Sequence, residues 1–504
     1  MTVDNAQYSC LVFSHSERCS IWAPSFVGRE LNPMTIVEVI VVAYVLGVLG
    51  LALRLRNRTK NLDDFFVGGR SFSLWYNVNT LAATAIGSGT TIGVAGMTYA
   101  DGISAGWILI GFAIGFGLIA VLIAEPLHRM KSVTMTDVIG DRFGDRARAI
   151  ASVLILVQYF GIAAAQVLAL GLMTASLLDI SLTLSIITMG SVMIVYTVVG
   201  GLLSISLVDI FQMTLIAIGI MVVLPYVGLD EVGGAGGLSD GLSSDYFNPT
   251  AMGAAGLIGM LAWIIPQGFL SQELWIRVLA SKSPSVARRS TLIASFAVYL
   301  PYMVSILVIG LCGAVLLPGI NPDTVIPRLI TEYTPPVVQG VLFAALLSVL
   351  MSTATSVMLV AGSNLIKDVV LRIDRRPHSD RSLLIASKLG VIVVGALSIV
   401  LALSADGIIE LMQNVATPYV GALFPIVLAV FFWPRASATA ALATMLVSIV
   451  LSTILYATDW TVWDLHPIVI NLCASTVTLA LVSFAIPNKH TTTTVPRDAT
   501  TEEA

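Results

Sequence analysis

About thirteen long apolar runs divide this chain, and each has roughly the 20 apolar residues that a helix needs to cross the hydrocarbon core of a bilayer. Lipid offers no hydrogen-bond partners to an open backbone, so runs of this length are expected to be helices. The expected spans cover residues 34–54, 75–100, 106–127, 148–178, 181–200, 207–228, 251–275, 291–317, 336–370, 382–405, 408–432, 436–457 and 466–486. The fold class is therefore predicted to be an all-α polytopic membrane protein.

The composition supports this prediction. Charged residues make up 11% of the 504 residues, whereas soluble domains average roughly 25%. Apolar residues reach 57%, and the mean hydropathy is +0.91. No nucleophile–base arrangement, phosphate-binding loop or metal-ligand spacing is visible, so we expect neither an enzyme nor an organic cofactor. The net charge of −4 lies in loops on both sides, so it gives no reason to expect a nucleic-acid partner.

Basic residues occupy alternate gaps between the spans. The gaps after the first, third, seventh and ninth spans hold Arg54, Arg56, Arg58, Lys60 and Arg70; Arg129, Lys131, Arg142, Arg146 and Arg148; Arg277, Lys282, Arg288 and Arg289; and Lys367, Arg372, Arg375, Arg376 and Arg381. The intervening gaps hold acids such as Asp230, Glu231, Asp240 and Asp245, with Arg328 as the exception. The positive-inside rule then predicts an outside N-terminus and a cytoplasmic C-terminus.

The ends of the chain are polar. Residues 1–33 are expected to form an extracellular tail or to reflect an over-long translation start, and residues 487–504 a cytoplasmic tail. Cys10 and Cys19 would be free to pair outside the cell, whereas Cys312 and Cys473 lie in apolar runs and are expected to pack there. Compact loops and a short tail are typical of a protein of a prokaryotic plasma membrane, and no obligate protein partner is evident.

Two of the expected spans contain residues that interrupt helices. Gly87 and Gly89 lie inside the second span, and Pro266 and Gly268 inside the seventh. Glycine costs about 1 kcal/mol and proline about 3 kcal/mol in a helix interior. Close helix packing is one explanation for membrane glycines. Interrupted helices in matching positions of two halves instead indicate a transporter site.

The spacing of the two interruptions suits an inverted repeat. They lie five spans apart, so residues 75–228 would form the first half of a core and residues 251–432 the second half. The first span, 34–54, and the last two, 436–486, would then be peripheral. No sequence identity between the halves is visible, so the repeat is inferred from the interruptions alone.

A polar stripe follows one face of the ninth span. Its hydroxyl residues are Ser348, Ser352, Thr355, Ser356 and Ser363, with Thr353 beside them. Residues three and four apart share a helix face, so several hydroxyl oxygens could meet at one place. Each hydroxyl could also bond back to its own helix. Hydroxyl and carbonyl oxygens without a carboxylate suit a hard, singly charged cation. Asp209, near the start of the sixth span, is either an interfacial acid or an ion ligand.

Several stretches match the motifs of one known family. They are residues 61–70 around Asp63-Asp64-Phe65-Phe66; residues 196–201 ending in Gly200-Gly201, with Asp209 and Gln212; Gln272-Glu273-Leu274-Trp275-Ile276-Arg277; residues 339–356 with Met351-Ser352-Thr353; and, more weakly, Phe432-Trp433-Pro434-Arg435. Through them the chain resembles the sodium:solute symporter family, which has the inverted-repeat fold of the amino-acid transporter LeuT. Together these stretches cover about residues 34–486. The resemblance implies a 5+5 helix core with two broken helices.

The resemblance also implies coupling by Na⁺. Its first sodium site would use the side chains of Ser352 and Thr353 and the backbone carbonyls of Ala83, Ile86 and Val349. A second sodium site, found in some members, would use Asp209, Ser352, Thr355 and Ser356. Threonine replaces the expected serine at position 355, which leaves the second site open. Ala85 stands where some members have an acid or amide, which argues against close kinship with those members.

The expected function is sodium-coupled symport of a small organic solute by alternating access. Candidates for solute contact are Thr90, Gln158, Gln166, Trp263, Gln267 and Gln413. Glycine-lined N-termini of half-helices favour a carboxylate-bearing solute. A proton-coupled symporter of the same fold is the alternative, although no titratable group looks clearly central and Glu273 and Asp209 both look close to cytoplasmic helix ends. A gradient-independent facilitator or channel would not need the hydroxyl cluster.

Overall fold

The computed structural model describes residues 35–55, 68–130, 134–366, 380–405, 407–458 and 465–487. All but the first of these residues belong to one compact unit, Ile36–Ala504. The predictions for residues 1–33, including Cys10 and Cys19, and for the C-terminal tail beyond residue 487 lie outside the described residues. Within those ranges the chain is almost entirely helical, and Phe72 and Ser281 form an isolated β-bridge.

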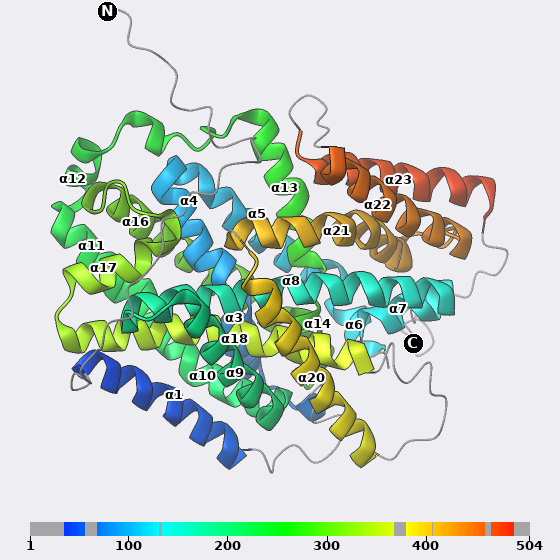
Figure 1. Ribbon diagram of the computed structural model, residues 1–504. Coiled ribbons are helices and arrows are strands. Elements are labelled where there is room, and N and C mark those ends of the chain that lie inside the picture. Colours follow the sequence, from blue (N-terminus) through cyan, green and yellow to red (C-terminus); the bar gives the residue numbers. More distant parts are fainter. Residues whose placement is uncertain are drawn as a thin grey trace, which may run out of the picture. The chain divides into compact units, whose positions relative to one another are not determined.

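The spanning helices follow the predicted order (Figure 1). They are α1 (Ile36–Leu55), α3 (Leu74–Ala85) with α4 (Val94–Asp101), α5 (Gly106–Leu118) with α6 (Ala124–Arg129), α8 (Asp145–Leu178), α9 (Leu182–Gly200), α10 (Leu202–Ile218) with α11 (Leu224–Val232), α13 (Gly253–Phe269) with α14 (Gln272–Ala280), α15 (Pro284–Leu292) with α16 (Tyr299–Leu316), α18 (Pro336–Asn364), α20 (Asp380–Ala402), α21 (Ile408–Phe432), α22 (Ala438–Thr458) and α23 (Pro467–Ala485). Shorter helices between them are α7 (Met135–Phe143), α12 (Gly234–Gly241) and α17 (Val325–Tyr333).

Twelve continuous helical stretches of the described residues are long and apolar enough to cross a membrane. The difference from the predicted number lies in residues 74–129. The 41-residue stretch Gly89–Arg129 contains the second part of the predicted span 75–100 and the whole of the span 106–127. The chain turns between them at Gly102, whose φ of 72° suits glycine and where a Cβ atom would overlap the backbone of Tyr246. Helix α3, with 12 residues, is too short to be counted alone.

Helix α18 lies at the centre of the protein. It packs against α1, α8, α10 and α20, and it also contacts α3 (Figure 1). In α18, 94% of the most apolar stretch is buried inside the protein, against 22% in α1. The outward faces of α1, α20 and α23 carry exposed apolar side chains such as Leu46, Val400 and Leu481, which suits contact with lipid. Helices α22 and α23 pack closely against each other.

The second span is broken where the sequence predicted it. Helix α3 ends at Ala85, Ile86 has an extended backbone (φ −91°, ψ 103°), and helical structure resumes at Ser88. Residues Gly89–Gly93 then form a π-helical segment before α4 begins. Such widened turns often occur at functional sites. Gly87 therefore lies in the break itself, and Gly89 opens the second half of the helix.

The break in the seventh span lies later than predicted. Helix α13 continues through Pro266 and Gly268, and the chain leaves the helix only at Leu270 and Ser271. Gly268 serves packing instead: a Cβ atom there would lie 2.8 Å from the carbonyl oxygen of Phe112 in α5. Helices α13 and α5 can approach this closely because glycines lie at their contact. The prediction that Pro266 and Gly268 mark the break is therefore wrong.

Two charged residues also lie deeper than predicted. Arg277, assigned to a cytoplasmic gap, lies inside α14 and is only 1% exposed. Without Arg277, the basic residues predicted for the gap after the seventh span are Lys282, Arg288 and Arg289. Asp209 lies two turns inside α10 and is fully buried, so it is neither an interfacial acid nor a helix cap. The orientation of the termini stays a prediction.

Candidate functional site

The break in α3 redirects two backbone N–H groups. In an α-helix the N–H of residue i bonds the carbonyl of residue i−4. Here the N–H of Gly87 donates to Thr90 Oγ1 at 2.9 Å, and the N–H of Ser88 donates to Gln166 Oε1 at 3.0 Å. The carbonyls of Ala83 and Thr84, which these groups would have bonded, are thus left for other partners deep inside the protein.

Hydroxyl groups of α18 meet those carbonyls. Ser352 Oγ lies 2.8 Å from the carbonyl oxygen of Ala83 and 3.0 Å from that of Val349. Thr353 Oγ1 lies 2.8 Å from the carbonyl oxygen of Ile86 and 3.1 Å from that of Thr84. The structure therefore brings together the five residues predicted for the first sodium site. We call their oxygens, from Ala83, Ile86, Val349, Ser352 and Thr353, the α3–α18 oxygen cluster.

The chemistry of this cluster fits a hard monovalent cation. All its oxygens are neutral carbonyl or hydroxyl groups, and Ser352 and Ala83 are fully buried. A divalent cation such as Ca²⁺ would ordinarily be held by carboxylates. Among the described residues no group of three or more His, Cys, Asp or Glu side chains could hold a metal ion. The donor set suits Na⁺, because carbonyl and hydroxyl oxygens can replace the water around such an ion.

The rest of the polar stripe bonds mainly within α18. Ser348, Thr355, Ser356 and Ser363 each donate to the carbonyl four residues earlier, at 2.8, 2.8, 2.9 and 2.6 Å. For these residues the local explanation for a membrane serine or threonine holds. Ser352 and Thr353 differ because α3 is broken directly opposite them.

In the structure the guanidinium of Arg277 lies among the residues predicted for the second sodium site. It is already bonded to two of the four predicted ligands, with Nη2 2.9 Å from Asp209 Oδ2 and 2.8 Å from Ser356 Oγ. Arg277 Nε also donates to Thr80 Oγ1, which donates to Asp209 Oδ2 at 2.6 Å. Thr355 is committed to α18. A second cation would have to displace a fixed one.

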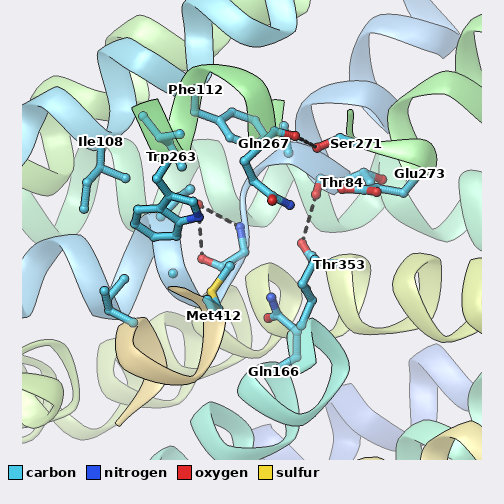
Figure 2. Close-up of a pocket in the computed structure, with 17 residues that line it drawn as sticks. Thr84, Ile108, Phe112, Gln166, Trp263, Gln267, Ser271, Glu273, Thr353 and Met412 are labelled. Atoms are coloured by element: carbon cyan, nitrogen blue, oxygen red, sulfur yellow. Dashed lines mark hydrogen bonds between the residues drawn. The ribbon is translucent and has the colours of Figure 1, made fainter. Parts of the chain in front are cut away.

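A cavity of about 50 Å³ lies beside the α3–α18 oxygen cluster (Figure 2). Its lining residues are Thr84, Ala85, Gly87, Gly89, Thr90, Ile108, Phe112, Ile162, Gln166, Trp263, Ile264, Gln267, Ser271, Glu273, Thr353, Ile409 and Met412. They come from both broken helices and from α5, α8, α18 and α21. Thr353 belongs to both the cavity wall and the oxygen cluster, so a solute and an ion would share that wall.

Four of the six residues predicted to contact a solute line this cavity: Thr90, Gln166, Trp263 and Gln267. Gln158 does not line it, but its Nε2 donates to Gln267 Oε1 at 3.2 Å. Gln413 does not line it either. Adjacent residues of a helix point about 100° apart, and the cavity receives Met412 and Ile409 of α21 instead.

The cavity offers N–H donors. The indole N–H of Trp263 is buried and has no hydrogen-bond partner among the described residues. The amide of Gln166 uses its oxygen to accept the N–H of Ser88, so its nitrogen keeps its two hydrogens for other partners. An unpartnered buried donor is costly, and a bound acceptor would remove that cost. A carboxylate oxygen is one acceptor that fits.

Three polar cavity residues were missed from the sequence: Thr84, Ser271 and Glu273. Glu273 is 7% exposed and lines the cavity, so the prediction that it lies near a cytoplasmic helix end is wrong. The hydroxyl of Tyr159 in α8 donates to Glu273 Oε2 and accepts the N–H of Gln272 at 2.6 Å. An ionisable residue in a membrane span is a functional candidate by default, and that signal was available in the seventh apolar run.

Comparison with known proteins identifies the family. The model of the sodium:solute symporter family matches residues 65–448. The high-affinity proline transporter PutP of Bacillus subtilis is 28% identical over 417 residues, which is 77% of this chain and 86% of that protein. Sodium/proline symporter 2 of Staphylococcus saprophyticus is 26% identical over 472 residues, which is 85% of this chain and 88% of that protein.

Solved structures show the same fold. A Na⁺-coupled sialic acid symporter in a substrate-bound outward-open state superposes with a TM-score of 0.79 at 19% identity, over 90% of this chain and 99% of that one. Mhp1, a nucleobase-cation-symport-1 family transporter in a closed conformation, gives 0.57 at 17% identity, over 84% and 96%. The prediction of a LeuT-like fold with two broken helices is confirmed, and the chain belongs to the sodium:solute symporter family.

Proposed function

We propose that the protein is a secondary active transporter that couples one Na⁺ to the uptake of one small carboxylate-bearing solute. The observation that carries this proposal is the contact of Ser352 and Thr353 with the carbonyls of Ala83 and Ile86, at 2.8 Å each. Bound there, Na⁺ supplies a positive charge that joins α18 to the broken end of α3. The protein would work in a bacterial plasma membrane with its N-terminus outside, as the loop charges predict.

Coupling follows from where the ion binds. Ser352 and Thr353 belong to α18, whereas Ala83 and Ile86 belong to the broken second span, so an ion held by both disfavours their separation. A ligand shifts a conformational equilibrium only by its difference in affinity for the two states. Because Thr353 also lines the solute cavity, a solute bound there would favour the same conformation, in which α18 lies against α3. Each ligand then favours the conformation that binds the other.

The energy available suffices for concentrative uptake. Moving one charge across 100 mV is worth about 2.3 kcal/mol. A tenfold sodium gradient adds about 1.4 kcal/mol, and each further ~1.4 kcal/mol is a tenfold ratio. One sodium per solute would therefore sustain roughly a 500-fold accumulation. The Arg277–Asp209 ion pair supports one sodium rather than two.

Proline is the first solute to test. The two bacterial relatives named above are proline transporters, and the N–H groups of Trp263 and Gln166 suit its carboxylate. The helix that resumes at Ser88 also points its N-terminus at the cavity, where its dipole favours negative charge.

Proton coupling is the second candidate, because one observation favours it. Glu273 is a carboxyl group in the cavity wall, held by Tyr159, and a proton could occupy it during transport. Such a protein would accumulate solute from a proton gradient in potassium buffer. A facilitator would show no dependence on either gradient.

The deciding experiment is a thermal-unfolding screen of purified protein against a solute panel, in NaCl and in KCl. A ligand of the folded state stabilises by about 2.7 kcal/mol at 100 times its dissociation constant. We expect a solute to raise the midpoint in sodium only, and Ser352→Ala with Thr353→Ala to abolish the sodium dependence. Equal shifts in sodium and potassium for every hit would contradict the proposal.

A further inference from the structure

Buried charge in the described part of the protein is confined to three side chains: Asp209, Glu273 and Arg277. A charge taken out of water is costly unless it is paired. Arg277 and Asp209 form an ion pair of 2.9 Å with both side chains almost fully buried. That pairing leaves Glu273 without an ion pair of its own in the described part, and Arg277 acts on its carboxylate only from a distance.

Arg277 does not serve both acids. Its Nη1 donates to the backbone carbonyl of Glu273 at 3.0 Å, and its other donors reach Thr80, Asp209 and Ser356. The Glu273 carboxylate accepts a hydrogen bond from the hydroxyl of Tyr159, and this donor carries no charge. No ion pair of Glu273 occurs among the described residues. A carboxylate in this setting calls for a cation.

The hydrogen-bond acceptor Glu273 and the donor Trp263 lie on different sides of the cavity. Figure 2 shows Glu273, Ser271 and Thr84 together on one side of Gln267, while Trp263 lies on the other side with Ile108. The unpartnered indole N–H of Trp263 is a donor, whereas the Glu273 carboxylate only accepts. A solute that spans the cavity would therefore present an acceptor to Trp263 and a positively charged donor to Glu273.

We propose that the Glu273 carboxylate accepts a hydrogen bond from a positively charged amine of the solute, so that the transported solute is a zwitterionic amino or imino acid. This assignment rests on the function proposed above and narrows its solute class. The sodium ion in the α3–α18 oxygen cluster offsets the charge of Glu273, and a zwitterion adds no net charge. A simple carboxylate would instead leave a buried negative charge.

The alternative is that Glu273 binds a proton. A protonated Glu273 would donate a hydrogen bond and would favour a plain carboxylate. Solute affinity would then weaken as the pH rises, and a glutamine at position 273 would bind solute with no dependence on pH. The two readings thus predict opposite solute preferences.

The test measures solute dissociation constants of the purified full-length protein in NaCl and KCl, by thermal unfolding and by calorimetry. The probes are L-proline with cyclopentanecarboxylate and pyrrolidine, and L-alanine with propionate and ethylamine. The variants are Glu273→Gln, Glu273→Asp and the matched control Glu125→Gln. Glu125 is exposed and its contact with Arg288 spans 3.5 Å, so its change should leave binding unaltered.

We expect wild-type protein and the control to bind a zwitterion at least tenfold more tightly than its desamino carboxylate or its decarboxylated amine. Glu273→Gln should weaken zwitterion binding at least tenfold, and Glu273→Asp should weaken it less because the charge is kept. Without solute, Glu273→Gln should still unfold at a higher temperature in NaCl than in KCl. This result would show that the variant is folded and that its ion site is intact.

Three results would overturn the assignment: unchanged zwitterion binding by Glu273→Gln, equal wild-type affinity for plain carboxylates, or the pH pattern of a protonated Glu273. A different result would contradict the proposed function without contradicting the role of Glu273. If zwitterions bind through Glu273 equally well in sodium and potassium, sodium coupling is wrong while the role of Glu273 stands.

Discussion

The hydroxyl oxygen of Ser352 lies 2.8 Å from the carbonyl oxygen of Ala83, a residue 269 positions earlier in the chain. That carbonyl is available because the N–H of Gly87 bonds Thr90 Oγ1 instead of continuing α3. One backbone break therefore produces two consequences. It frees oxygens beside α18 for an ion, and it opens the wall of the solute cavity at Gly87 and Gly89.

Replacing Trp263 by phenylalanine should weaken solute binding without affecting sodium binding. The change keeps an aromatic ring in the cavity and removes the unpartnered indole N–H. A hydrogen bond of this kind contributes about 1 to 1.5 kcal/mol, so we expect roughly a tenfold loss of solute affinity by calorimetry.

Trp275→Phe is the matched control. The indole N–H of Trp275 donates to the carbonyl oxygen of Phe269 at 2.8 Å, and Trp275 does not line the cavity. This change should lower the unfolding midpoint and leave solute affinity nearly intact. If instead the two tryptophan variants affect solute affinity alike, Trp263 does not bind the solute.

Arg277→Met should strongly destabilise the protein, because it leaves the carboxylate of Asp209 buried without an opposite charge. Breaking a buried ion pair from one side costs about 3 to 5 kcal/mol. The double variant Asp209→Asn with Arg277→Met should recover most of that loss in thermal unfolding. A double variant as unstable as Arg277→Met alone would show that Arg277 stabilises the protein through Thr80 and Ser356 instead.

Much of the fold could be predicted from the sequence, because length and hydropathy decide which segments span and because glycines mark the first break. The second break was misplaced. Pro266 is the stronger helix breaker, yet the helix continues past it until Ser271, since α13 is held against α5 by packing that a single segment does not reveal. That shift carried Glu273 and Arg277 from a presumed helix end into the protein interior.

The site was predicted only in part for a related reason. Ser352 and Thr353 could be named from the family resemblance, since their hydroxyls contact the carbonyls that the break in α3 leaves open. The solute cavity depends on the rotation of α21 about its axis, which decides whether Met412 or Gln413 faces inward. The partner that neutralises Asp209 comes from α14, and no sequence spacing connects the two.

Gly115→Ala should destabilise the contact of α5 with α13. An added Cβ atom would overlap the carbonyl oxygen of Ile265, and backbone cannot move aside cheaply. Overpacking of this kind costs about 1 to 3 kcal/mol. Gly47→Ala in α1 is the control, because nothing lies within 4 Å of its Cβ position and alanine favours a helix. An equal unfolding midpoint for both variants would exclude the close contact.

Stability should decline in mild acid through His466, which precedes α23. Burial lowers the pKa of His466 below its ordinary value near 6.5, and its Nδ1 accepts the N–H of Ile468 at 3.2 Å. The folded state therefore binds fewer protons than the unfolded state, so this stabilisation is present above pH 6.5 and is lost as the pH falls below it. His466→Asn, which can cap without titrating, should flatten that part of the pH–midpoint curve. A curve unchanged by the variant would contradict this role.

Equilibrium binding of ²²Na⁺ to the purified protein tests the central claim most directly, because it needs no knowledge of the solute. We predict saturation at one sodium per chain, at least a tenfold loss of affinity in Ser352→Ala and in Thr353→Ala, and no change in Ser363→Ala, whose hydroxyl donates to the carbonyl of Leu359. Binding that survives both α18 variants, or that saturates at two ions, would contradict a single sodium site between α3 and α18.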